Sequence, residues 1–486
     1  MSLLLQRKNI FFKPDSKRVL ARYFNLSNER REKIILRVLN MDKQLQEDTL
    51  NQLLRNFSRR HRSVIAVWEK NFKRATENLV LRSGRPNYSQ KEKLLLGAYF
   101  TLEYSVEAAA FFNPSIVESP DQTQLRKGQK RIILSFRATG EGHVSSIVFR
   151  SGVIDENWDI ELDEVGTLLE KPETIKNHEY NKQDFLQKLQ QIDVNNSLFD
   201  TANQYLADTF TYEELRQFIR KMQQQTLSVD EGIFLNHMLW LASSHYEMRY
   251  SLDTSISERV IFPISDTEKN GIEDARFLQF RNDKGKSIYY ATYTAYDGIS
   301  IMPKLLSTKD FVSFKVQPIN GKIANKGAAL FPRKVNGKYA MLCRIDGENN
   351  YIAFSDDIIN WHTDVILLNE PDLPWEFVQL GNCGSPLETS EGWLVITHGV
   401  GPMRQYAIGA CLLDLHDPTK VRGRLKTPLI YPNEFEREGY VPNVVYSCGQ
   451  IIHNGHLIIP YAMSDHSSTY ATVCLEELLA EILNGQ

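Results

Sequence analysis

The chain has 486 residues, 42% of them hydrophobic and 24% charged, so it can bury a large core in two or three domains. Its formal net charge of -3 leaves no basic excess, which argues against a nucleic-acid partner. The sequence has neither a signal-peptide core at its start nor the roughly 18 consecutive apolar residues of a membrane span, so we expect a cytoplasmic protein that contacts no membrane. Five cysteines without a C-x-x-C pair argue against a disulfide framework and a bound metal.

Apolar residues at helical spacing open the chain, from about residue 27 to residue 84. Ile35, Val38 and Leu39, for example, recur three and four positions apart with charged residues around them. This periodicity predicts a helical hairpin or small bundle, and we assign residues 1–94 to a helical extension. Its basic run, Arg55 to Arg62, is typical of a solvated helix face, so we assign it no function.

A second helical block is predicted near residues 170–250. Thr211 with Glu214, and Ser228 with Glu231, have the spacing of capping boxes, and apolar faces follow both. We assign residues 166–254 to a helical insertion, and we expect its apolar faces to pack on the helical extension.

The remaining sequence is typical of β-strands, and the strands repeat. Residues 95–165 and 255–486 contain five units, each with two apolar runs around a polar loop. The units from the second onward follow at the spacing of four-stranded blades, which favours a five-bladed β-propeller with an accessory helical region, whereas a two-sheet sandwich stays open. The five units are Arg131–Arg150, Ser287–Thr308, Lys338–Ser355, Gly392–Leu415 and His456–Leu475.

Loops of a propeller converge at one end of its channel, so polar residues near strand ends are the site candidates. Glu273 and Asp274 are adjacent carboxylates and should point to opposite faces of their strand; a salt-bridged strand end would look the same. Four basic residues from different units would form an anion site, although His398 alone is typical of a structural histidine. The candidates are Arg137, Glu273, Asp274, Arg276, Tyr296, Asp297, Lys326, Arg344, His398, Tyr406 and Asp465.

Several ordered strings resemble glycoside hydrolase family 130, the β-mannoside phosphorylases and β-1,2-mannosidases. The resemblance covers most of residues 95–165 and 255–480. It implies a five-bladed propeller and an inverting reaction at a non-reducing-end β-mannosyl residue. The strings are FFNPS (Phe111–Ser115), GIEDAR (Gly271–Arg276), YYATYTAYDG (Tyr289–Gly298), KGAALFPRKVNGKY (Lys326–Tyr339), SDDIINW (Ser355–Trp361), GSPLETSEGW (Gly384–Trp393), THGVG (Thr397–Gly401) and YAIGACLLDLHDPTKVRGR (Tyr406–Arg424).

The resemblance also implies roles for single residues. Asp274 matches the proton donor of the family's Glu-Asp-Pro-Arg motif, although Ala275 replaces the proline here. Carboxylates that hold the mannose or its neighbour match Asp297 and Asp465. The basic positions that hold inorganic phosphate match Arg137, Lys326, Arg344 and His398. The implied product is α-mannose 1-phosphate, with phosphate as co-substrate and no cofactor or metal.

Two other functions stay open. A β-1,2-mannosidase would need a carboxylate base, for which Glu141, Glu348 and Glu434 are candidates. A non-catalytic propeller would use the same carboxylates only to bind glycan hydroxyls. The helical regions either shape the pocket for the β-mannooligosaccharide or support a homo-oligomer.

Overall fold

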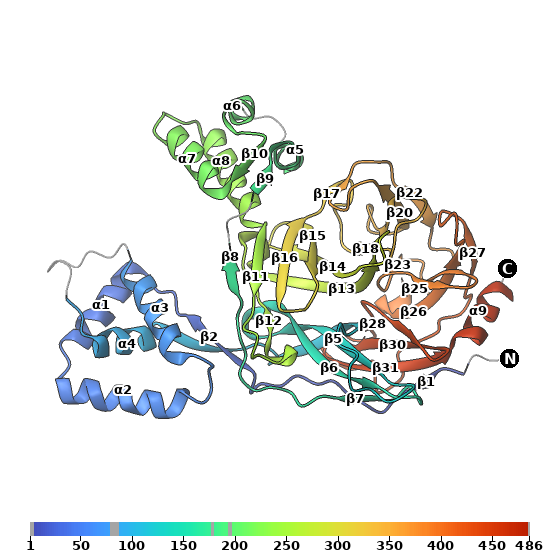
Figure 1. Ribbon diagram of the computed structural model, residues 1–486, viewed down its shortest axis with the longest axis horizontal. Helices are drawn as coiled ribbons and strands as arrows, with labels where there is room; N and C mark the ends of the chain where they lie inside the picture. The colour runs from blue at the N-terminus through green and yellow to red at the C-terminus, as the bar shows by residue number, and fades with distance from the viewer. Residues whose placement is uncertain (1–3, 78–86, 176–178, 193–196, 485–486) are drawn as a thin grey trace.

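The computed structural model describes residues 4–77, 87–175, 179–192 and 197–484. Parts of the two predicted helical blocks, residues 78–86, 176–178 and 193–196, lie outside the described residues. The protein is mainly β with accessory helices, as predicted, and its five cysteines are free thiols (Figure 1). Within the described ranges, no helix is both long enough and apolar enough to cross a membrane.

Each of the five predicted repeats folds as one antiparallel hairpin, which confirms the repeat. Strands in these hairpins are apolar on both faces because both faces are covered; every residue of β25, for example, is buried. The hairpins pair β5 (Lys130–Thr139) with β6 (Ser145–Ile154), β14 (Ser287–Tyr296) with β15 (Ile301–Thr308), β19 (Tyr339–Cys343) with β20 (Asn350–Ser355), β25 (Gly392–Val400) with β26 (Tyr406–Leu413), and β30 (His456–Met463) with β31 (Ser467–Cys474).

The first two hairpins share an 11-stranded sheet in the order β4-β5-β6-β13-β14-β15-β16-β11-β8, with β7 and β12 on β6. Gly271 at the start of β13 pairs with Ser145 at the start of β6 and so joins the two halves. The strands not yet given are β4 (Ala110–Glu118), β7 (Ile160–Leu162), β8 (Glu173–Ile175), β11 (Tyr246–Arg249), β12 (Val260–Ile261), β13 (Gly271–Arg281) and β16 (Ser313–Pro318).

Each of the other three hairpins has its own sheet, in the orders β18-β19-β20-β22, β23-β25-β26-β27 and β1-β31-β30-β28. The strand pairings among the described residues give open sheets and do not by themselves close a ring. Their further strands are β18 (Ala329–Leu330), β22 (Ile366–Asn369), β23 (Gln379–Asn382), β24 (Leu387–Thr389), β27 (Val421–Arg424), β1 (Gln6–Arg7), β28 (Val445–Tyr446) and β29 (Ile451–His453). Two-stranded pairs are β2 (Val19–Tyr23) with β3 (Thr101–Ser105), β9 (Glu179–Asn181) with β10 (Thr209–Thr211), and β17 (Asn320–Gly321) with β21 (Asn360–Trp361).

The helices form two separate blocks, and both predicted capping boxes, at Thr211 and Ser228, are confirmed. The first block holds α1 (Asn28–Leu39), α2 (Lys43–Phe57), α3 (Val64–Thr76) and α4 (Gln90–Tyr99). The second holds α5 (Lys182–Ile192), α6 (Leu198–Tyr205), α7 (Tyr212–Gln223) and α8 (Val229–Ser243), and α9 (Leu475–Asn484) ends the described chain.

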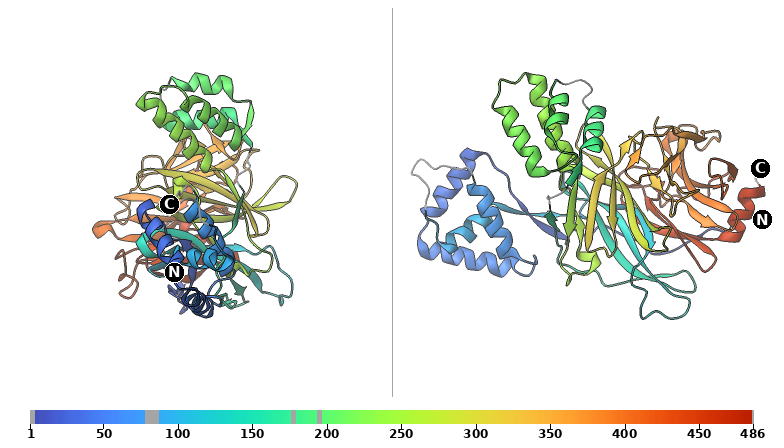
Figure 2. Two further views of the ribbon diagram at one scale, coloured as in Figure 1. Left: turned by 90° about the vertical axis from the view of Figure 1, so that its left-hand side faces the viewer. Right: turned by 45° about the horizontal axis from the view of Figure 1, so that its top comes forward.

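The expectation that the two helical blocks pack on each other is wrong. Phe218 and Phe234 of the second block share a hydrophobic core with Phe314 of β16, whereas α1, α3 and α4 form their own core around Leu95. Figures 1 and 2 show the two blocks apart on the β body. The sheet from which the insertion emerges therefore covers the apolar faces of the insertion. These faces do not need the helical extension as a partner.

The predicted extension also contributes a strand to the β body. β1 pairs with β31 in the last sheet, and Phe12 forms a further bridge with Ser468. The N- and C-terminal segments consequently lie side by side at that sheet (Figure 1).

A buried ion pair connects β15 to the turn after the helical insertion. Lys304 Nζ donates to Glu268 Oε1 at 2.7 Å, and both side chains are fully buried. Glu268 also accepts hydrogen bonds from the hydroxyls of Tyr246 and Tyr293. Burial opposes ionisation of Glu268, but Lys304 and these hydrogen bonds outweigh it and lower the pKa of this carboxyl.

Replacing Glu268 with alanine should therefore destabilise the protein strongly. The variant leaves the Lys304 ammonium buried without its counter-charge, which costs about 3–5 kcal/mol. Urea denaturation followed by tryptophan fluorescence measures the loss. Glu29→Ala is the matched control, since Glu29 and Lys33 form an exposed pair that contributes little. Equal midpoints for the two variants would contradict this assignment.

Candidate active site

One pocket of about 210 Å³ collects side chains from four of the five repeats and from β13, the strand that pairs with β14 of the second repeat. We name it the polar pocket, because it holds carboxyl, guanidinium, ammonium and imidazole groups. Seven of the eleven residues predicted from the sequence line it: Arg137, Asp274, Lys326, Arg344, His398, Tyr406 and Asp465. Its other lining residues are Asn113, Gln379, Arg404, Val441, Val444 and Tyr446.

Asp274 owes its orientation to an irregularity in β13. The register with β14 shifts between Glu273 and Arg276, and Asp274 has a left-handed φ of 55°. The predicted alternation of Glu273 and Asp274 therefore fails, because such a bulge re-aims a side chain. Both carboxylates instead face Arg137, at 2.9 Å for Glu273 and 3.5 Å for Asp274.

Backbone conformations of this kind are concentrated in the polar pocket. Asn113 lies at a register shift in β4 with φ 50°, and Arg404 and Asp465 each have φ 52°. Left-handed non-glycine residues are uncommon and cost about 1–3 kcal/mol each, so they persist only where the surroundings impose them. Asn113 Nδ2 donates to Asp274 Oδ1 at 2.7 Å, which ties two of these residues together.

The two carboxyl groups of the pocket have opposite pKa shifts. Burial opposes ionisation of Asp274, but Arg137, Arg276 and the Asn113 hydrogen bond outweigh it and lower its pKa. Burial and then the charge of Asp274 raise the pKa of Asp465 to about 6. Below about pH 6, Asp465 therefore holds a proton while Asp274 is ionised.

Glu273 lies beside the pocket and holds two of its cations. Its carboxylate pairs with Arg137 through Oε1 and with Lys326 through Oε2 at 2.6 Å. Arg344 and Arg404, by contrast, form no ion pair within the described part of the chain. The pocket thus retains unneutralised positive charge, which suits an anionic ligand.

His398 lies in the pocket, as predicted, but it contributes no positive charge. Burial, and then the nearby Arg344 and Arg276, lower its pKa to about 3. Its Nδ1 lies 3.2 Å from the Asn382 carbonyl, which requires a donor, so Nε2 accepts from Gln379 Nε2 at 3.2 Å. The four basic residues predicted to form the anion site thus supply three cations and one neutral ring.

Arg276 is buried beneath the pocket, with 2% of its surface exposed. It donates to the Asp274 carbonyl at 3.1 Å and to the Tyr446 hydroxyl at 2.7 Å. Arg276 therefore supports the bulge and orients Tyr446, and it does not reach the cavity itself.

Tyr296 and Asp297 do not line the pocket. Asp297 Oδ1 accepts from the amides of Ile299 and Ser300 at 2.8 and 2.7 Å, and Tyr296 donates to the Gly298 carbonyl. These bonds close the turn between β14 and β15. Glu141, Glu348 and Glu434, the candidate bases of a hydrolase, are also absent from the described lining.

Sequence reasoning missed six lining residues, among them Asn113, Arg404 and Tyr446. Asn113 stands inside the string Phe111–Ser115 that carried the family resemblance, and that position was the available signal. Arg404 lies in a short turn after β25. Arginines are common in exposed turns, so nothing in the sequence singled it out as a pocket residue.

Known proteins are similar to this chain mainly over its second half. The profile of glycoside hydrolase family 130, described as beta-1,4-mannooligosaccharide phosphorylase, matches residues 252–483. The 1,2-beta-oligomannan phosphorylase of Thermoanaerobacter sp. (strain X514) is 36% identical over 207 residues, which are 41% of this chain and 67% of that relative. The chain belongs to glycoside hydrolase family 130. Both helical blocks lie outside the residues matched by the family profile.

Two further comparisons involve Listeria innocua. Its Beta-1,2-mannobiose phosphorylase is 32% identical over 228 residues, which are 46% of this chain but less than two thirds (63%) of that relative. A solved structure of that organism's enzyme in complex with beta-1,2-mannobiose aligns with 78% of this chain and 93% of its own, at 23% identity and a TM-score of 0.46. A score this low does not assign a fold.

The raised pKa of Asp465 predicts a pH-dependent stability. Its carboxyl keeps a proton up to about pH 6 in the folded protein, whereas the unfolded chain releases it near pH 3.8. The folded state therefore loses stability as the pH rises through this window, by about 3 kcal/mol in all. Asp465→Asn removes this loss, so its melting temperature should rise relative to wild type from pH 4 to pH 6.5. A constant difference over this range would contradict the prediction.

Proposed function

We propose that the polar pocket transfers a non-reducing-end β-mannosyl residue to inorganic phosphate with inversion, giving α-mannose 1-phosphate. The observation that carries the proposal is a carboxyl group in one cavity with two arginines, Arg344 and Arg404, that form no ion pair among the described residues. The Thermoanaerobacter and Listeria relatives are named for β-1,2-linked substrates, which favours β-1,2-mannooligosaccharides. The reaction uses phosphate as co-substrate and requires no other cofactor.

In this reaction a phosphate oxygen attacks the anomeric carbon as the bond to the bridging oxygen breaks. Asp274 supplies the proton that the departing oxygen takes, directly or through a sugar hydroxyl. Arg137, Lys326 and Arg344 hold the phosphate on the opposite face. Asp465 lies in the same cavity and accepts from mannose hydroxyls.

The cations around Asp274 account for its lowered pKa. Arg137 and Arg276 are the main charges that lower it, and Lys326 adds to them. A phosphate dianion beside Arg137 and Lys326 offsets their field and raises the pKa of Asp274. Phosphate binding therefore favours the protonated form of Asp274, so that the proton donor and the nucleophile are present in the pocket at the same time.

Hydrolysis is the alternative within the same family. An inverting hydrolase needs a second carboxylate as base, about 6.5–9.5 Å from the acid. Among the described lining residues, Asp465 is the second carboxyl group, and its pKa of about 6 would leave it ionised at neutral pH. The excess of cations over carboxylates favours phosphate, which brings its own nucleophilic oxygen.

The proposal includes a five-bladed β-propeller. Contacts between neighbouring repeats support it, since β14 contacts β18, β19 contacts β23, β26 contacts β28, and β30 and β31 contact β4. The strand β1 on β31 adds the start of the chain to the last blade. Such a ring explains how residues from four repeats and from β13 reach one cavity.

Asp274→Asn should reduce turnover of β-1,2-mannobiose by about 10²- to 10⁴-fold, because the departing oxygen loses its proton donor. Binding of the disaccharide, measured by calorimetry, should persist. Asp283→Asn is the control, since Asp283 is an exposed residue of the turn at the other end of β13. Near-normal turnover by the Asp274→Asn variant would show that Asp274 is not the proton donor.

Phosphate dependence separates the proposed reactions. The protein, incubated with β-1,2-mannobiose, should produce mannose 1-phosphate only when inorganic phosphate is present, and NMR should show the α anomer first. Mannose release at an unchanged rate without phosphate would establish a hydrolase. Disaccharide binding without turnover in either buffer would establish a glycan-binding protein.

A further inference from the structure

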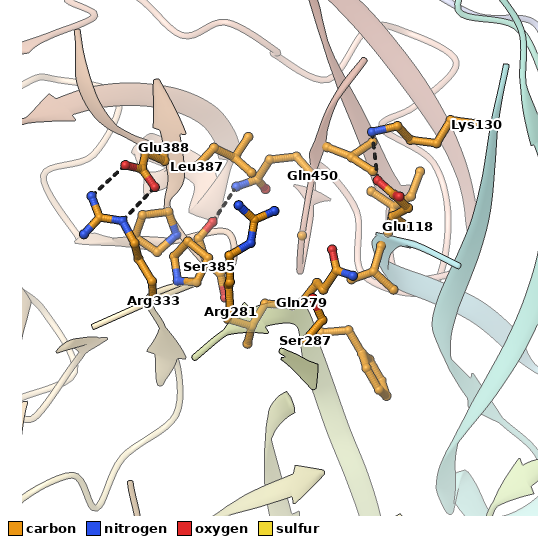
Figure 3. A pocket seen from close by; sticks show the side chains of 18 residues that line it. Glu118, Lys130, Gln279, Arg281, Ser287, Arg333, Ser385, Leu387, Glu388 and Gln450 are labelled. Carbon is orange, nitrogen blue, oxygen red and sulfur yellow. Dashed lines mark hydrogen bonds and ion pairs between the residues drawn. The ribbon is translucent and has the colours of Figure 1, made fainter. Parts of the chain in front are cut away.

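A second cavity has a volume of about 310 Å³, and Figure 3 shows its lining; none of its lining residues lines the polar pocket. We name it the distal pocket. Its lining residues include Gln279, Arg281, Ser385, Leu387, Gln450 and Ile451. None of these lines the polar pocket, and neither the family resemblance nor the proposed reaction gives them a role.

The same strands reach both cavities. β13 carries Asp274 in the polar pocket and Arg281 in the distal pocket, and seven residues of strand span roughly 20 Å. β4 likewise carries Asn113 to the first cavity and Ile116 to the second. On β4, Ser115 lies between Asn113 and Ile116 and is only 1% exposed. Because this buried residue separates the two, the cavities are distinct sites reached from different parts of the same strands.

Two buried polar atoms at the distal pocket have no protein partner. Ser385 is 8% exposed and Gln450 5% exposed, and Ser385 Oγ and Gln450 Oε1 form no hydrogen bond among the described residues. Gln450 Nε2 donates to the Ser385 carbonyl at 3.1 Å, which leaves Oε1 as a free acceptor. Buried polar atoms are nearly always satisfied, so these two atoms indicate a ligand with hydroxyl groups.

One cation of the distal pocket forms no ion pair among the described residues. Arg333 pairs with Glu388 at 2.6 Å and Lys130 with Glu118 at 3.0 Å, whereas Arg281 forms no ion pair in the described part of the chain. Figure 3 shows the Arg281 guanidinium pointing into the cavity, on the side where Gln450 and Ser385 lie. A guanidinium in such a place suits a carboxylate or phosphate.

We propose that the distal pocket binds a small hydroxylated organic anion of the sugar-phosphate class. Arg281 holds the phosphate, and ring hydroxyls donate to Gln450 Oε1 and Ser385 Oγ. Leu387 and Ile451 cover the apolar face of the ring. The cavity volume lies at the lower end of the usual range for small-molecule sites. The site is additional to the proposed reaction and does not depend on it.

Titration calorimetry with D-glucose 6-phosphate tests the site. Wild-type protein should bind one equivalent, and glucose or inorganic phosphate alone should not compete. Arg281→Gln should weaken binding by at least about tenfold, the loss typical of one charge-assisted contact. Ser385→Ala should also weaken it without lowering the melting temperature, because Ser385 Oγ has no partner in the described structure.

Lys284→Gln is the matched control, since Lys284 is an exposed cation in the turn after Arg281. Lys326→Gln, in the polar pocket, tests whether the probe occupies the other cavity, and it should leave the affinity unchanged. Absence of saturable binding to wild type would overturn the proposal. Binding that Lys326→Gln abolishes and Arg281→Gln preserves would also overturn it, because the probe would then occupy the polar pocket.

Discussion

The hydrogen bond from Asn113 to Asp274 joins two left-handed residues on different strands, 161 positions apart in the chain. Each residue lies where its strand departs from regular register, so neither conformation would be stable alone. Phe277 N donates to Ser115 Oγ at 3.1 Å and fixes β4 against β13 just beyond the two bulges. The position of the acid therefore depends on the packing of β4 against β13.

The charged groups of the polar pocket fall into two sets. Glu273 and the buried Arg276 hold Arg137, Lys326 and Tyr446 in place. Arg344 and Arg404 form no ion pair among the described residues, so their charge stays available. A neutral His398 fits this arrangement, because one more cation would lower the pKa of Asp274 further and leave it without the proton that it must donate.

Sequence patterns predicted the hairpins because burial on both faces leaves continuous apolar runs, as in β25. They also predicted Asp274 and its cations, since polar residues at the ends of such runs converge. Bulges leave no such pattern, so the shared orientation of Glu273 and Asp274 was mispredicted. The partner of the helical insertion was also mispredicted, because an apolar face such as that of Phe218 does not specify which surface covers it.

The two cavities make different demands on the strands that they share. β13 is regular from Arg276 to Arg281, and β4 is regular from Ser115 to Glu118, so the left-handed residues lie at the polar end alone. Chemistry requires an acid held within a fraction of an ångström, and strained bulges supply that fixed position. Binding of a small anion requires only a long cationic side chain and free acceptors, which regular strands present without strain. Side-chain replacement at Arg281 should consequently leave the geometry around Asp274 intact, because the backbone between them is held by the β14 ladder.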